Sequence, residues 1–190
     1  LTSLSAERFE YRYIKGDKYR ILSTVVEDVY LNRVLTHQAE ILNRIAVTVT
    51  DVRNNSGMHE AVFQTSERGI GTDQGRSFYW SREYQSLFER DAQGRLDIDK
   101  QYFMPVVRNV PVFPDRDLEE GDSWSAPGEE AHDFRDSFGI PEPFKIPFTA
   151  NYTYLGEQEW NGKLYPSFSV TYRIFNEPED VQGLLWPRRI

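Results

Sequence analysis

The chain has no cysteine among its 190 residues. This absence excludes a disulfide framework, a thiolate zinc site and a thiol nucleophile. It leaves the redox compartment open, because a chain of this length buries a sizeable core and needs no covalent staple.

Basic stripes and long apolar runs are also absent. The formal net charge is −8, which argues against nucleic acid or an anionic membrane surface as the main partner. No apolar run approaches the roughly 20 residues that a transmembrane helix needs. The sequence therefore predicts no nucleic-acid partner and no transmembrane segment.

The familiar catalytic patterns G-x-S-x-G and H-E-x-x-H do not occur. Residues 69–75 read G-x-G-x-x-x-G, but a strand rather than a helix is expected to follow, so no helix N-terminus faces a phosphate. Residues 115–121 resemble the start of a calcium loop, yet Ala126 stands where its last carboxylate belongs. His132, among the acids of residues 129–133, has no second ligand cluster. We therefore expect a non-enzymatic protein with no catalytic residue, no metal and no cofactor.

Aromatic residues, by contrast, make up 14% of the chain, a composition that favours strands. The clearest strand pattern surrounds Asn161-Gly162, a dipeptide typical of a two-residue type I′ turn. Apolar and polar residues alternate before this turn, from 148 to 154, and after it, from 168 to 174. The two runs predict a long hairpin around which the other strands assemble.

The register of this hairpin requires a β-bulge. A two-residue turn pairs Trp160 with Lys163, and regular pairing from there would set the apolar residues of the two strands on opposite faces. One extra residue restores a common face. We expect it at Gly156 or Pro166, because a bulge suits glycine and proline cannot donate to the ladder.

Shorter runs predict further antiparallel strands. The run 19–30 is apolar or β-branched on both faces around Val25, so we expect it in a central, doubly covered position. A strand follows from residue 34 through Val52, with a helix over 33–44 as the alternative. The other expected strands cover residues 9–13, 58–67, 78–88 and 95–108, with turns at 32–33, 54–57 and 91–94.

Residues 111–147 have a different composition. They are rich in proline, and nine acidic residues stand against two arginines between 115 and 136. Both features discourage a packed sheet, so we expect a long connection over the surface. The predicted fold is a mostly-β antiparallel meander that forms a half-barrel or β-sandwich, with this connection on one side. Residues 1–178 are expected to form a single domain, and 179–190 a tail toward a further module.

A set of large aromatic residues could line a cavity for an apolar ligand or stack on sugars. Packing in the core is the alternative for such residues, and it is the commoner fate of aromatic stripes. The weak candidates for ligand binding are Trp80, Tyr84, Tyr102, Trp124, Tyr152 and Tyr154.

Five segments carry a family resemblance: F-E-Y-R-Y-I-K-G-D-K-Y-R at 9–20, H-Q-A-E-I-L-N-R-I at 37–45, R-N-V-P-V-F-P at 108–114, G-D-S-W at 121–124 and F-T-A-N-Y-T-Y at 148–154. Together they resemble the N-terminal module of spirochaetal OmpA-like envelope proteins of the peptidoglycan-associated type. The resemblance covers roughly residues 9–178. It implies export to the periplasm or cell envelope and an OmpA-like domain further along the parent protein. That domain's ligand-contacting segment has no match in these residues, so peptidoglycan binding is not carried over.

The sequence thus favours a non-enzymatic cell-envelope module with a structural or binding role in the periplasm, as part of a larger OmpA-like protein. Its expected partners are other envelope components or its own C-terminal module. The alternative is a carrier or receptor domain for an apolar or sugar ligand in an aromatic-lined cavity. A hydrolase, which would need carboxylates converging near 115–136, is the third interpretation.

Overall fold

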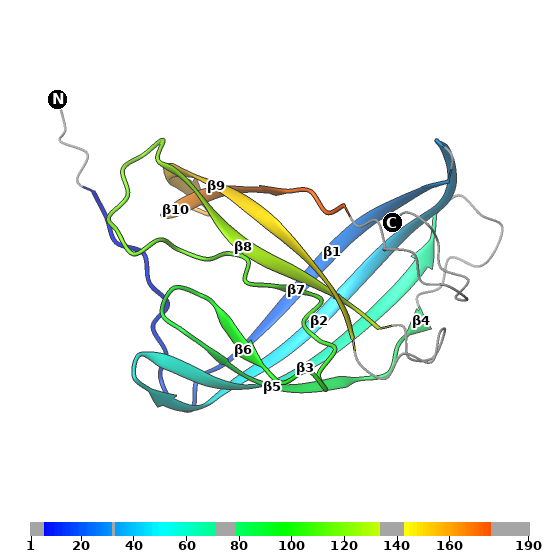
Figure 1. Ribbon diagram of the computed structural model, residues 1–190, viewed down its shortest axis with the longest axis horizontal. Helices are drawn as coiled ribbons and strands as arrows, with labels where there is room; N and C mark the ends of the chain where they lie inside the picture. Colours follow the sequence, from blue (N-terminus) through cyan, green and yellow to red (C-terminus); the bar gives the residue numbers. More distant parts are fainter. Residues whose placement is uncertain (1–5, 32, 71–78, 134–142, 176–190) are drawn as a thin grey trace.

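The computed structural model describes residues 6–31, 33–70, 79–133 and 143–175. Every regular element in these ranges is a β-strand, and the strands form two antiparallel sheets. Figure 1 shows the long strands of the larger sheet side by side, with the smaller sheet lying across them. The mostly-β antiparallel fold class is therefore confirmed.

The larger sheet is a curled half-barrel whose strands follow one another in the order β1-β2-β3-β5-β6. Its concave face carries the odd-numbered residues of β2, because Val47 and Val49 are buried there opposite Ala61 and His59 of β3. The strands are β1 (Lys18–Leu31), β2 (Val34–Arg53), β3 (Ser56–Gly69), β4 (Tyr79–Trp80), which also pairs with β3, β5 (Tyr84–Arg90) and β6 (Leu96–Ile98).

The smaller sheet has the order β10-β9-β8-β7. Its buried face carries the even-numbered residues of β9, among them Phe148, Ala150 and Tyr152. The strands are β7 (Val107–Arg108), β8 (Ser123–His132), β9 (Phe144–Trp160) and β10 (Lys163–Tyr172).

The predicted hairpin and its bulge are both confirmed. Trp160 pairs with Lys163 across a turn in which Asn161 and Gly162 have positive φ. The register then shifts between Pro166 and Phe168, opposite Gly156, whose φ is 74°. The shift sets Phe168 opposite Tyr154, so the rings of the two strands share one face.

Residues 103–113, here called the central segment, include β7 of the smaller sheet and pack against both sheets. Met104, Phe103 and Val106 pack against the concave face of the larger sheet. Val107, Val110 and Val112 pack against the inner face of the smaller sheet. The substantial packing of strand on strand lies within each sheet, so the central segment is the main filling between the two layers.

The N-terminal residues do not form the strand expected over 9–13. Their one bridge among the described residues joins Glu7 to Leu118, and the segment passes from the smaller sheet to the larger one. Phe9 packs on Tyr154 and Phe168 of the smaller sheet, whereas Tyr13 meets His59 of the larger one.

The prediction of a central position for residues 19–30 is wrong. They belong to β1, which pairs only with β2 and lies at the edge of the sheet. Residues 34–44 form a strand rather than the alternative helix over 33–44, and Arg33, at φ 67°, lies in the predicted turn before it.

The prediction of a surface connection over 111–147 is also wrong in large part. Residues 123–132 form β8, which pairs along its whole length with β9, itself starting at Phe144. Two other predicted strands are shorter than expected. The run 78–88 is divided between β4 and β5, and only 96–98 and 107–108 of the run 95–108 are strand. Residues 71–75 of the glycine-rich loop and the tail 179–190 lie outside the described residues.

Candidate ligand-binding groove

An open groove of about 660 Å³ lies among the described residues. Its floor is the concave face of the half-barrel, with Val47, Val49 and Phe63. Its opposite wall is the central segment, with Pro105 and Val107. The size and the apolar lining are those of a site for a small organic ligand.

Three tyrosines close one end of the groove. Tyr11 and Tyr13 come from the N-terminal segment, and Tyr19 comes from the groove face of β1. Burial raises the pKa of each of these phenols above its ordinary value, and the charge of Arg90 opposes the rise. The tyrosines are therefore neutral at physiological pH. The hydroxyl of Tyr13 donates to the carbonyl of Asp91 at 3.0 Å.

Arg90 lines the groove beside these rings, and Arg12 and Asp17 are the other charged residues of its lining. Arg90 lies at the end of β5, its guanidinium carbon is 4.5 Å from the centre of the Tyr11 ring, and its Nε donates to the carbonyl of Gly94 at 3.2 Å. No carboxylate among the described residues forms an ion pair with it, whereas neighbouring Arg95 is paired with Asp91 at 3.1 Å. A half-buried guanidinium in an apolar groove is a favourable site for an anionic group.

The register of the strands gives the groove a direction. Arg90 pairs with Gly57, next to the β2–β3 turn. Two residues further from that turn, Phe88 pairs with His59. Beyond them lie Ile45 and Phe63, which pair with each other. The groove thus runs from a polar end at Arg90 to an apolar end. A second cavity of about 240 Å³ extends it there and shares Ile45 and Phe63 as lining.

His59 lies beneath the polar end and is 2% exposed. Its ring stacks on the ring of Phe88, with 5.1 Å between the two centroids. The ring of Tyr13 meets it edge-on at 5.0 Å. Neither ring nitrogen has a hydrogen-bond partner among the described residues. Burial lowers the pKa of His59, with a weaker opposing effect of the Gly57 backbone. His59 is therefore a neutral residue that supports two lining rings, Tyr13 and Phe88, without lining the groove itself.

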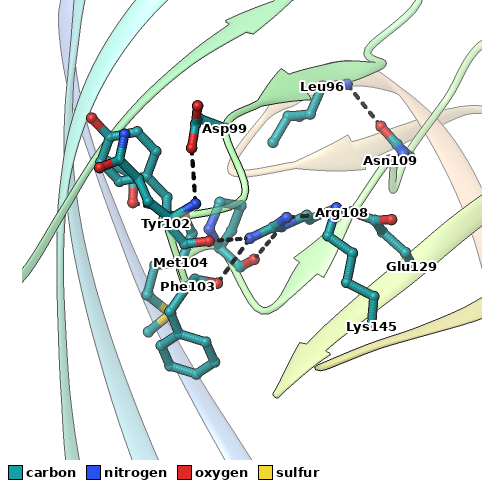
Figure 2. A network of polar contacts seen from close by, with 12 residues as sticks. Leu96, Asp99, Tyr102, Phe103, Met104, Arg108, Asn109, Glu129 and Lys145 are labelled. Carbon is teal, nitrogen blue, oxygen red and sulfur yellow. Dashed lines mark hydrogen bonds and ion pairs between the residues drawn. The ribbon is translucent and has the colours of Figure 1, made fainter. Parts of the chain in front are cut away.

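A buried arginine fixes the wall formed by the central segment. Arg108 is 1% exposed, and its guanidinium donates to the carbonyls of Tyr102, Phe103 and Pro105 at 2.7–3.1 Å. Its Nη1 is 3.3 Å from Oε1 of Glu129 on β8. Figure 2 shows this network, in which Asn109 also accepts a hydrogen bond from the backbone of Leu96. The central segment is thus tied to both sheets.

Burial lowers the pKa of Arg108, and the charge of Glu129 opposes this effect. Lys145 reaches the same carboxylate oxygen at 2.9 Å. Glu129 therefore joins a buried cation to a half-exposed one, and none of the three residues lines the groove.

The structure does not bring the six predicted aromatic residues to one cavity, and none of them lines the groove. Tyr152 and Tyr154 are buried in the smaller sheet, where Trp124 stacks on Tyr152 and donates to the carbonyl of Val112 at 2.8 Å. Tyr84 packs edge-on against Phe103. The other two lie apart: Trp80 under the guanidinium of Arg44, and Tyr102 in the loop that Arg108 holds.

The groove residues that the sequence analysis missed are Tyr11, Tyr13, Tyr19 and Arg90. The alternation of Phe9, Tyr11 and Tyr13 is visible in the sequence, but it was assigned to a strand. Arg90 ends a strand just before a turn, a place where an arginine is ordinarily solvated. The N-terminal segment brings its rings there by hydrogen bonds from the Tyr11 backbone to Ala92 and from the Tyr13 hydroxyl to Asp91, contacts that no local sequence pattern reveals.

Other features of the described residues add no second site. They contain no group of three or more His, Cys, Asp or Glu side chains placed to hold a metal ion. They also contain no helix with the length and apolar character needed to cross a membrane. Comparisons with protein-family models, with curated proteins and with solved structures gave no match.

Proposed function

We propose that this chain is a non-enzymatic binding module for an amphipathic ligand with an apolar body and an acidic head. The apolar body lies along the groove against Val47 and Phe63, and the head meets Arg90. The observation that carries the proposal is Arg90 itself, a groove-lining cation with no carboxylate partner among the described residues. The neutral tyrosines beside it supply hydroxyl groups for the same head.

The wall opposite the floor supports a ligand with an apolar body rather than a sugar. Sugars stack on aromatic faces and need many hydrogen-bonding groups, whereas the deeper half of the groove is lined by Ile45, Val47 and Val107. Burial of an alkyl chain against such a surface contributes about 25 cal/mol per Å². The acidic head then fixes the orientation.

Competition with an apolar fluorescent probe tests the proposal. Saturated long-chain fatty acids and alcohols of equal chain length are titrated against the bound probe, because the two series differ only in the acidic head. We expect the acid to bind about tenfold or more tightly than the alcohol, the value of one charge-assisted hydrogen bond. Arg90→Gln should abolish this preference.

Arg95→Gln is the matched control. It removes the same charge from the same β5–β6 region, but Arg95 is paired with Asp91 and does not line the groove. The preference for the acid should persist in this variant. Two results would contradict the proposal: no binding of either series to wild-type protein, or a preference for the acid in Arg90→Gln as large as in wild type.

The cellular setting is a separate part of the proposal. The resemblance of the sequence to OmpA-like envelope modules supports a binding role in the periplasm or cell envelope, within a larger protein. Fractionation of the source cells, followed by immunoblotting with an antibody against this chain, tests the setting. Recovery in the cytosolic fraction would contradict it and leave the ligand proposal untouched.

A further inference from the structure

The free edge of β1 is the largest unpaired strand edge of the described residues. β1 has 14 residues and pairs only with β2. Natural sheets protect such edges with lysines, prolines or bulges. Here Lys18 stands at one end and a register shift between Val29 and Tyr30 at the other. The nine residues from Arg20 to Asp28 contain no lysine, no proline and no bulge.

Two large apolar side chains of this stretch are strongly exposed. Leu22 is 76% and Val26 65% exposed on the convex face. Arg20 and Asp28 flank them on that face, since even-numbered residues of a strand share one side. Arg20 forms no ion pair among the described residues, and Asp28 accepts one hydrogen bond from Gln38 at 2.8 Å.

The backbone of the same stretch presents its hydrogen-bonding groups at even-numbered positions. The backbone of Val49 bonds to Gly16 and Asp17, and Tyr19 pairs in register with Val47. Odd-numbered residues of β1 therefore bond to β2, and bonding alternates along an antiparallel pair. The N–H and C=O groups of residues 20, 22, 24, 26 and 28 point to the free edge.

We propose that two copies of this chain associate through antiparallel pairing of their β1 strands, with Thr24 on the two-fold axis. Thr24 then bonds to Thr24 of the other copy. Leu22 lies opposite Val26 and Arg20 opposite Asp28, each contact occurring twice. The interface is isologous, as in most homodimers, and the two half-barrel sheets become continuous.

The register follows from this match of the side chains. A shift of one strand by two residues, in either direction, keeps even-numbered residues opposite one another. It sets Leu22 opposite Thr24 or opposite Asp28. Only pairing about Thr24 joins both the apolar residues and the opposite charges. Cross-strand pairs of these kinds each contribute about 0.2–1 kcal/mol. Because Tyr19 and Ile21 of β1 line the groove, dimer formation also sets the two grooves side by side.

Disulfide trapping tests the register directly, because the chain has no cysteine of its own. Thr24→Cys places two thiols on the two-fold axis, at about 5.5 Å between Cα atoms, which a disulfide spans. Arg20→Cys is the matched control, since its two copies would lie about 27 Å apart along the strands. We expect an oxidised dimer from Thr24→Cys and none from Arg20→Cys on a non-reducing gel. The reverse result, or no dimer from either variant, overturns the register.

Sedimentation velocity over a concentration series tests the association itself. Thr24→Pro removes the edge N–H without removing a bond to β2, and proline is tolerated at edge positions. Its dimer should dissociate at least about tenfold more readily than wild type. Thr24→Ala keeps the N–H and should remain dimeric. Wild-type protein that is monomeric at every concentration overturns the proposal.

Charge exchange gives an independent check that does not depend on proline. Arg20→Asp sets like charges opposite one another twice and should weaken the dimer, as should Asp28→Arg. The double exchange Arg20→Asp with Asp28→Arg restores opposite charges and should recover it. Equal weakening in the double variant contradicts pairing about Thr24.

Discussion

Arg108 and Glu129 form an ion pair in which the arginine side chain is completely enclosed while the glutamate is 27% exposed. Their atoms Nη1 and Oε1 are 3.3 Å apart. The pair joins the central segment to β8, and three backbone carbonyls accept the remaining guanidinium bonds. Replacement of Arg108 should therefore lower the free energy of unfolding more than replacement of Glu129.

Arg108→Met should destabilise the fold strongly. It leaves Glu129 without its buried partner and three carbonyls without their donors, a change that costs about 3–5 kcal/mol in other buried pairs. Urea unfolding measures the loss. Glu129→Gln should cost less, because Arg108 keeps its carbonyl acceptors. Equal stability of wild type and Arg108→Met would show that the network does not hold the central segment.

His59 should make the protein less stable at mildly acidic pH. Burial lowers the pKa of His59 below its ordinary value of 6.5. The unfolded chain therefore takes up the proton first as the pH falls through about 6.5, and the folded state loses stability there. His59→Phe keeps the ring contacts with Phe88 and removes two nitrogens without partners, so the slope of stability against pH should flatten. An unchanged slope in His59→Phe contradicts the assignment.

Gly156→Ala and Gly162→Ala should separate the cost of the bulge from the cost of a turn. Both glycines have φ near 75°, a conformation that costs an alanine about 1–2 kcal/mol. A Cβ at Gly162 meets open space, but one at Gly156 approaches the carboxylate of Glu120 at 2.8 Å. We expect the larger loss of thermal stability at Gly156, since the bulge also sets the faces of β9 and β10. Removal of Glu120 by Glu120→Ala should relieve the excess.

Arg90→Gln should raise the pKa of Tyr11 and Tyr19 further. The charge of Arg90 lowers the pKa of both phenols and offsets part of the rise caused by burial. A spectrophotometric titration near 295 nm follows tyrosinate formation, and the folded variant should titrate at higher pH than wild type. Arg95→Gln should leave the curve in place. A downward shift in Arg90→Gln would show that its guanidinium does not face these rings.

The hairpin shows how far the sequence alone reaches. Asn161-Gly162 set the turn, and the alternation of aromatic residues then required the bulge that the structure has opposite Gly156. Both features are local, because turn geometry and side-chain period depend on a few adjacent residues. Local rules therefore predict this part of the fold in detail.

Prolines misled the prediction of β8 for a physical reason. Pro127 and Pro147 lie within β8 and β9, paired with Thr149 and Glu129. The alternation of bonds places each proline nitrogen on the side away from the shared ladder, where the neighbouring strands β7 and β10 do not reach. Composition cannot reveal which side of a strand is unpaired.

The edge position of β1 and the surroundings of Arg90 depend on contacts between residues far apart in the sequence, so local patterns did not predict them. Leu22 and Val26 predicted a covered strand, yet no described residue covers that edge. A sequence pattern does not distinguish burial within one chain from burial against another. Arg90 and Tyr11 are 79 positions apart, and the backbone bond from Tyr11 to Ala92 in the β5–β6 turn brings them together.

The central segment is a wall of the groove that is held from behind. Its residues Pro105 and Val107 flank Arg108 in sequence, but Arg108 does not line the groove and its guanidinium bonds to carbonyls and to Glu129 instead. We expect a substitution at Glu129 to alter the fit of a ligand only through the position of this wall, because Glu129 does not line the groove either.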